Sequence, residues 1–115
     1  MPRIFHVNWF RKDASGKFLW PGYGDNMRVL KWIVQRCQLG AHALETSIGW
    51  VPDYTDLDMR GIEGEITPER WAQLQAIDKR EWHNELVLQD ELFIKLYAHL
   101  PKELIFQREL LISRV

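Results

Sequence analysis

Helix-start signals recur through the second half of this 115-residue chain, and they constrain its fold more than any other feature. Thr67-Pro68-Glu69 offers a side-chain acceptor at an N-cap, followed by a proline in the first turn. Asp78 precedes Lys79-Arg80-Glu81 in the layout of a capping box, with aspartate in the cap role. Pro101 opens one more segment. The pattern predicts consecutive helices over residues 67–115, which form a helical tail.

Apolar residues recur at helical spacing within this tail and mark the faces expected to be buried. After Asp78 the stripe comprises Trp82, Leu86, Phe93 and Leu96, with Val87 and Leu92 beside it. After Pro101 the inner face is expected to hold Leu104, Ile105, Leu111 and Ile112. A chain this short buries only a modest core. We therefore expect exposed apolar patches that make the isolated chain self-associate or leave it marginally stable.

The first 26 residues predict a pair of strands. Residues 3–9, RIFHVNW, are rich in β-branched and aromatic side chains, and alternation places Phe5, Val7 and Trp9 on one face. KDASGK, residues 12–17, supplies turn chemistry, and residues 18–20 form a short return strand. The expected fold class is α+β, with a short antiparallel strand pair followed by about four helices.

The middle of the chain divides into a helix and an irregular segment. Asp25 or Asn26 is expected to cap a helix over residues 27–40 that stops at Gly40. Residues 41–66 are irregular: SIGWVP, residues 47–52, predicts a short strand, and residues 53–65 read as a surface loop. The inner side of the helix is expected to carry Leu30, Ile33, Val34 and Cys37.

Charge and composition exclude several classes of function. The formal net charge is −1, so nothing global favours nucleic acid or an anionic membrane as a partner. The N-terminus lacks a long apolar run, and we expect a soluble, cytoplasmic protein. The sequence has one cysteine, no Walker-type glycine loop, no serine elbow and no acidic metal cluster, which predicts no catalytic constellation in this chain. The four histidines, at positions 6, 42, 83 and 99, show no metal-ligand spacing and are expected to be surface or structural residues.

Aromatic residues are unusually dense in FRKDASGKFLWPGYGDN, residues 10–26. Rings in a hairpin usually belong to local core, and that interpretation stays open here. The last ring, however, lies between glycines directly before a helix start, where free backbone N–H groups point outward. Bases stack on aromatic faces for about 1–3 kcal/mol each, and an asparagine amide can pair with a base edge. The rings of this stretch, Phe10, Phe18, Trp20 and Tyr23, together with the backbone-rich turn and an asparagine, would therefore make a workable purine pocket.

The run FHVNWFRKDASGKFLWPGYGDNMRVLKW, residues 5–32, closely resembles the guanine-binding segment of GTP-dependent phosphoenolpyruvate carboxykinase. The resemblance continues through SIGWVP and DELFIKLYAHLPKEL, and so covers nearly the whole chain. It implies that guanine lies among Phe10, Phe18 and Tyr23, and that Asn26 addresses the base edge, with Gly24 and Asp25 between them. Trp9 and Trp20 match neighbouring tryptophans, which we expect to provide packing. Tyr23 stands where phenylalanine is common in the family, and Asp25 where glutamate is common.

The resemblance also implies what the whole enzyme does. Residues 1–115 would be the C-terminal portion of its nucleotide-binding domain, within a larger α/β lobe. In this portion, residues 1–26 would form the strand pair and guanine loop, residues 27–40 a helix, residues 41–66 an irregular segment and residues 67–115 the helical tail. The enzyme, a lyase of gluconeogenesis, converts oxaloacetate and GTP to phosphoenolpyruvate, carbon dioxide and GDP. Its phosphate loop and its manganese and magnesium ligands lie upstream in the family, so this chain alone is expected to be inactive. The implied partners are a guanine nucleotide and the rest of the carboxykinase chain.

One alternative belongs to a different class of protein. The aromatic loop would also suit a stand-alone module that binds a nucleotide, single-stranded RNA or a peptide. The absence of a basic charge excess counts weakly against RNA.

Overall fold

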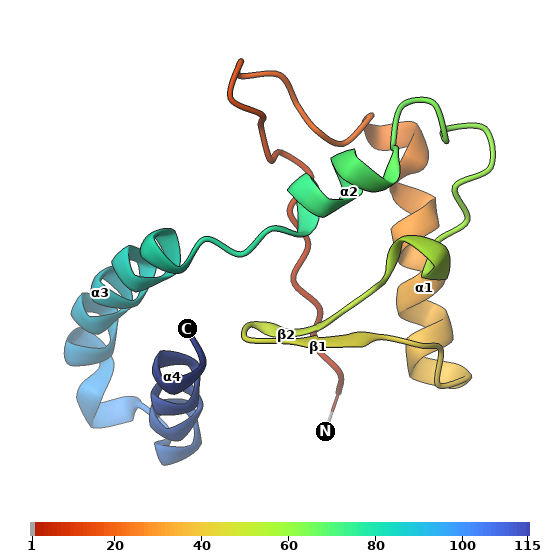
Figure 1. Ribbon diagram of the computed structural model, residues 1–115. Coiled ribbons are helices and arrows are strands. Elements are labelled where there is room, and N and C mark those ends of the chain that lie inside the picture. Colours follow the sequence, from red (N-terminus) through yellow and green to blue (C-terminus); the bar gives the residue numbers. More distant parts are fainter. Residues whose placement is uncertain (1) are drawn as a thin grey trace. The chain divides into compact units, whose positions relative to one another are not determined.

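The computed structural model describes residues 2–115, which form two compact units. The first unit holds the residues up to Leu44 together with Trp50–Ala76, and the second holds Glu45–Gly49 and Ile77–Val115. Within residues 2–115 the regular elements (Figure 1) are α1 Asn26–Gln38, β1 Leu44–Thr46, β2 Gly49–Val51, α2 Pro68–Gln75, α3 Lys79–Leu96 and α4 Lys102–Arg114, with 3₁₀ turns at Tyr23–Asp25, Tyr54–Asp56 and Tyr97–His99. The α+β class and the helices of the tail are confirmed.

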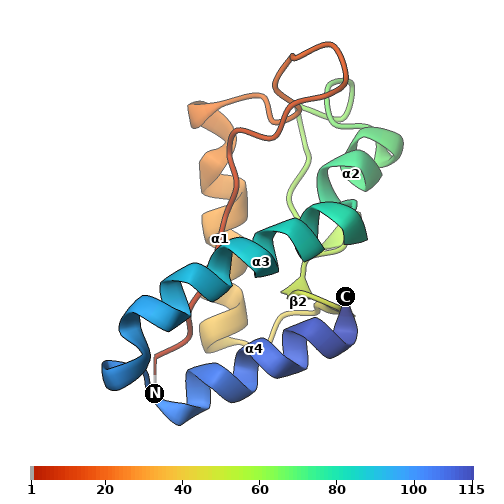
Figure 2. The same ribbon diagram turned by 90° about the vertical axis from the view of Figure 1, so that its left-hand side faces the viewer.

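The prediction of a strand pair within the first 26 residues is wrong: the two paired strands, β1 and β2, lie later in the chain. Residues 3–9 form no strand, and only a single bridge joins Lys12 to Phe18. The N-terminal segment instead runs beside α1 (Figures 1 and 2), where Phe5 packs edge-on against Trp32 at 6.1 Å between ring centroids. Phe5 and Trp9 are half-buried, but Val7, which was placed on the same face, is exposed. A strand needs a neighbouring strand as a partner for its backbone hydrogen bonds, and packing of side chains on a helix does not supply one. The alternating pattern therefore produced an extended segment and not a strand.

The sheet of this fold comes after α1. β2 confirms the strand expected within SIGWVP, and β1 is a partner that the sequence pattern did not predict. The two strands are joined by a tight turn in which Thr46 Oγ1 donates to the carbonyl oxygen of Gly49 at 2.7 Å. Gly49 has φ 131°, a conformation that favours glycine. The hairpin is therefore specified by its turn more than by its short strands.

The core of the first unit depends on the segment that was expected to be a surface loop. Its buried residues are Trp20, Trp32, Leu57, Met59, Ile62, Ile66 and Trp71. Three of these seven lie within residues 53–65, so the prediction of a surface loop is wrong. Successive turns, with Ile62 N–H donating to Met59 (3.0 Å) and Ile66 N–H to Ile62 (2.8 Å), direct apolar side chains inward between polar ones. This spacing matches neither a helix nor a strand, and that is why periodicity missed it.

The buried face of α1 is centred on Trp32, which is 3% exposed. Ile33 is half-buried as predicted, but Leu30, Val34 and Cys37 are exposed, so most of the expected inner face is wrong. A tryptophan buries the most apolar area and also needs a partner for its indole N–H.

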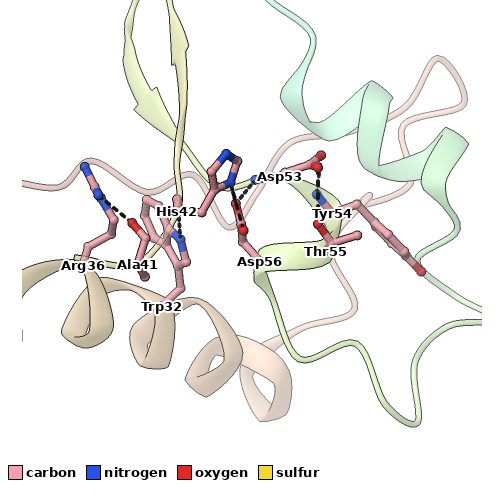
Figure 3. Close-up of polar contacts among 8 residues, drawn as sticks. All are labelled: Trp32, Arg36, Ala41, His42, Asp53, Tyr54, Thr55 and Asp56. Atoms are coloured by element: carbon pink, nitrogen blue, oxygen red, sulfur yellow. Dashed lines mark hydrogen bonds and ion pairs between the residues drawn. The ribbon is translucent and has the colours of Figure 1, made fainter. Parts of the chain in front are cut away.

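Figure 3 shows how the chain after α1 is held against this helix. Trp32 Nε1 donates to the carbonyl oxygen of His42 at 3.0 Å, and Arg36 Nη1 donates to that of Ala41 at 2.6 Å. His42 Nδ1 lies 2.9 Å from Asp56 Oδ2, at the 3₁₀ turn. Gly40, with φ 65°, ends the helix region as predicted. All four histidines are exposed, in agreement with a surface or structural role.

The cap residues of the tail helices are confirmed. Thr67 Oγ1 accepts the N–H of Arg70 at 3.2 Å, at the start of α2 in the first unit. In the second unit, Asp78 Oδ1 accepts the N–H groups of Arg80 (2.8 Å) and Glu81 (3.1 Å), where α3 begins. The cap bonds are short-range, and this explains why the sequence predicts them well.

In the second unit α3 and α4 run in opposite directions, joined by a short turn (Figure 2). Arg108 of α4 joins the two helices: it pairs with Asp90 at 2.7 Å, donates to the carbonyl oxygen of Leu86 at 2.9 Å, and lies over the Phe93 ring. Of the expected faces, Leu86 is buried and Trp82, Phe93, Ile105 and Leu111 are half-buried, whereas Val87, Leu92, Leu96, Leu104 and Ile112 are exposed. The apolar faces are thus only partly covered within the unit, and self-association of the isolated chain stays a prediction.

None of the helices in residues 2–115 has the length and apolar character needed to cross a membrane.

Candidate nucleotide site

The polar turn of the aromatic loop is built around the carboxylate of Asp13. Its Oδ1 accepts hydrogen bonds from the Ser15 hydroxyl (2.6 Å) and from the N–H groups of Ser15 (2.8 Å) and Lys17 (3.0 Å). The Ser15 hydroxyl, followed by the Lys17 N–H, lowers the pKa of Asp13 below its ordinary value. The N–H of Leu19 donates to the carbonyl oxygen of Arg11 at 2.8 Å, which closes the loop. The turn expected over residues 12–17 is confirmed.

Two of the three predicted stacking rings lie together on this loop. Phe10 and Phe18 have ring centroids 6.0 Å apart at an interplanar angle of 63°. They are exposed, at 71% for Phe10 and 47% for Phe18, so they do not belong to the core. Lys12 Nζ lies 5.2 Å from the centre of the Phe18 ring. The loop therefore presents an aromatic surface with a cation beside it.

The third predicted ring, Tyr23, is 93% exposed and has no aromatic partner among residues 2–115. It lies in the 3₁₀ turn Tyr23–Asp25, which follows Gly22 at φ 134°. Gly24, next in this turn, has open space where a side chain would stand. Asp25 Oδ1 pairs with Arg28 Nε at 2.9 Å and does not cap α1 with its side chain. The helix start predicted at Asp25 or Asn26 is confirmed, but the side-chain cap is not.

Asn26, the predicted reader of the base edge, is the first residue of α1 and is half-buried. Trp20 Nε1 donates to its Oδ1 at 2.8 Å. Trp20 itself is 5% exposed and lies 6.2 Å from the Trp9 ring. Packing by these tryptophans is confirmed, but the hydrogen bond to Asn26 was missed. The only signal of this hydrogen bond in the sequence is a tryptophan six residues before an asparagine at a helix start.

Arg70 of α2 holds the loop from a position about fifty residues further along the chain. Its Nε donates to the carbonyl oxygen of Leu19 and its Nη2 to that of Phe18, both at 2.9 Å. In return, Arg11 Nη1 donates to the carbonyl oxygens of Leu74 (3.0 Å) and Ala76 (2.7 Å), at the end of α2. These charge-assisted bonds fix the backbone that carries Phe18. Sequence reasoning gave Arg70 no role, because no local pattern joins it to the loop.

The described part of the chain offers no site for a metal ion. Within residues 2–115 no three histidine, cysteine, aspartate or glutamate side chains are grouped closely enough to bind one. The family resemblance places the manganese and magnesium ligands upstream in the family, outside these residues.

Residues 1–114 match the protein family described as the phosphoenolpyruvate carboxykinase C-terminal P-loop domain. Among curated proteins, the chain is 52% identical over 114 residues to the GTP-specific phosphoenolpyruvate carboxykinase of Anaeromyxobacter dehalogenans, covering 99% of this chain and 19% of that protein. The corresponding protein of Treponema pallidum is 42% identical, with 100% and 18% covered, and the cytosolic protein of Gallus gallus is 47% identical, with 96% and 17% covered. The chain thus spans about a fifth of the length of these relatives. It belongs to the family of GTP-dependent phosphoenolpyruvate carboxykinases.

Proposed function

We propose that this chain is the guanine-recognition segment of a GTP-dependent phosphoenolpyruvate carboxykinase. The whole enzyme would convert oxaloacetate and GTP to phosphoenolpyruvate, carbon dioxide and GDP, as a lyase of gluconeogenesis. Manganese and magnesium would be bound by the rest of that enzyme. A cytosolic location is in keeping with the name of the Gallus gallus relative.

The observation that carries the proposal is the exposure of two neighbouring rings on the loop, Phe10 and Phe18. Phe10 and Phe18 lie 6.0 Å apart and leave 71% and 47% of their surface open. Rings that served only as local core would be covered, so their exposure favours a stacking surface. Asn26 follows on the same segment, with its amide oxygen held by Trp20. Phe10, Phe18, Tyr23, Gly24, Asp25 and Asn26 are accordingly the proposed guanine-binding residues.

This segment would position the nucleotide, and the rest of the enzyme would supply the chemistry. No phosphate-binding loop of the Walker type occurs in the 115 residues. Holding the base fixes the far end of the nucleotide and so aligns its terminal phosphate for transfer. The three relatives named above match across 96–100% of this chain, which makes up only 17–19% of their length, and this favours an enzyme portion over a stand-alone binding module.

The stacking surface is tested by Phe18→Ala in the full-length carboxykinase that carries this segment. Loss of a stacked ring, worth about 1–3 kcal/mol, should raise the KM for GTP roughly five- to a hundred-fold. The KM for ATP should rise by a similar factor, because stacking accepts any base. Lys17→Ala, an exposed neighbour without a ring, is the control and should leave both KM values within about two-fold. An unchanged KM for GTP in Phe18→Ala would remove the loop from nucleotide binding.

A further inference from the structure

We propose that Trp20 is a positioning residue for base selection: its indole N–H fixes the orientation of the Asn26 amide, and this orientation favours guanine over adenine. The inference rests on the proposed function. It adds that Asn26 discriminates between bases only because a second residue holds it.

The chemistry of the two side chains determines which way the amide faces. An indole Nε1 only donates, so the Asn26 atom 2.8 Å away must be the acceptor Oδ1 and not the amide nitrogen. A flipped amide would bring two donors together and leave the Trp20 N–H without its partner. Trp20 is 5% exposed within the core and packs against Trp9, so its ring has little room to turn away.

The fixed orientation leaves the amide NH₂ group available. Asn26 is half-exposed, and within residues 2–115 its Nδ2 makes no hydrogen bond to another protein group. The carbonyl oxygen Oδ1 also has a second lone pair. The side chain therefore presents a donor and an acceptor, in a fixed order, to a base that lies on the loop.

For a purine held in one orientation, a fixed order of donor and acceptor suits only one of the two bases. Guanine presents a carbonyl acceptor at C6 beside the N1–H donor, so it accepts from Nδ2 and donates to Oδ1. Adenine presents an amino donor at C6 beside an unprotonated N1, so it needs the amide the other way round. An amide free to rotate would serve both bases equally well, and the Trp20 bond removes that freedom.

The test measures kcat/KM for GTP, ITP and ATP in the full-length enzyme with Trp20→Phe. Losing one hydrogen bond that orients the amide should narrow the GTP/ATP ratio about three- to ten-fold. The values of kcat/KM for GTP and ITP should fall by the same factor, because both bases carry the C6 carbonyl and the N1–H. A purely structural effect of the substitution would lower kcat/KM for all three nucleotides by the same factor and leave the GTP/ATP ratio unchanged.

Trp32→Phe is the matched control. Trp32 is equally buried in the same core, at 3% exposed, and also donates its indole N–H, to the carbonyl oxygen of His42 at 3.0 Å. Trp32→Phe should lower the free energy of unfolding by about as much as Trp20→Phe does, and it should leave the GTP/ATP ratio as in the wild type. If Trp20→Phe yields no folded enzyme, benzothienylalanine at position 20 keeps the ring shape and replaces the N–H with sulfur, and the same narrowing is expected.

Asn26→Ala separates failure of this inference from failure of the proposed function. A GTP/ATP ratio that falls in Asn26→Ala but not in either Trp20 variant would overturn the role of Trp20 and leave guanine reading by Asn26 intact. A ratio that no variant changes would overturn both the role of Trp20 and base reading by the Asn26 side chain. When Asn26→Ala is already present, Trp20→Phe should narrow the ratio no further, because the two residues act through one contact.

Discussion

Arg70 Nε lies 2.9 Å from the carbonyl oxygen of Leu19, and this contact ties α2 to the loop that carries the aromatic surface. A second nitrogen of the same guanidinium reaches the carbonyl oxygen of Phe18 at 2.9 Å. The backbone on which Phe18 stands is thus held by a residue far away in sequence. The position of the ring therefore depends in part on α2.

Arg70→Ala should therefore lower stability and weaken nucleotide binding together. Hydrogen bonds from a charged donor contribute about 1.5–3 kcal/mol, so the free energy of unfolding in urea should fall by about that amount. The KM values for GTP and ATP should rise in parallel, since Arg70 orders the loop and does not select the base. Arg60→Ala is the control: Arg60 is 85% exposed and pairs with Asp58 at the surface, so removing it should cost no more than about 1 kcal/mol. Equal losses in the two variants would show that Arg70 does not hold the loop.

Gly22 precedes the turn of Tyr23 with φ 134°, where a side chain strains the backbone although the space around it is open. Gly22→Ala should destabilise the protein by about 1–3 kcal/mol and raise the KM for GTP by displacing the turn. Gly64→Ala is the matched control, because Gly64 also faces open space but has no such backbone conformation. Thermal unfolding of the two variants gives the comparison, and an undiminished melting temperature for Gly22→Ala would contradict the strained turn.

Asp13 gives the loop a defined response to acid. Its folded-state pKa lies below the ordinary value of 3.8, chiefly through the Ser15 hydroxyl and then the Lys17 N–H. A lowered carboxylate pKa contributes stability that is fully present above the unfolded value and is lost as pH falls through the folded value. Ser15→Ala removes the largest cause, so an NMR titration should show the pKa of Asp13 moving up toward 3.8. Lys12→Ala leaves those bonds in place and should leave this pKa where it is. The same pKa in Ser15→Ala as in the wild type would contradict the assignment.

The sequence predicts those features of the fold that depend on short-range chemistry. Thr67 and Asp78 cap helices through bonds to residues two or three positions away, and Gly40 ends one through its own backbone conformation. The turn at Asp13 belongs to the same class, since its partners lie within four residues.

Features that depend on distant partners were predicted poorly. Residues 3–9 have the composition of a strand, but their side chains met a helix and no neighbouring strand. Leu57, Met59 and Ile62 lie among glycines and charges, and only the finished core shows that they are buried. In the candidate site, the loop residues were recognisable from their types and from the family resemblance. The bonds that hold them, from Trp20 to Asn26 and from Arg70 to Phe18, join elements that no local pattern connects.

The central claim is that Asn26 reads the guanine edge, and the ratio of kcat/KM for GTP to that for ATP in Asn26→Ala tests it most directly. Losing a two-point contact of about 1–3 kcal/mol should raise the KM for GTP roughly five- to a hundred-fold and hardly change that for ATP. The GTP/ATP ratio should therefore fall by the same factor, whereas in Phe18→Ala it should hold. An equal loss for both nucleotides in Asn26→Ala would contradict the account and would leave the backbone groups of residues 21–26 to read the base.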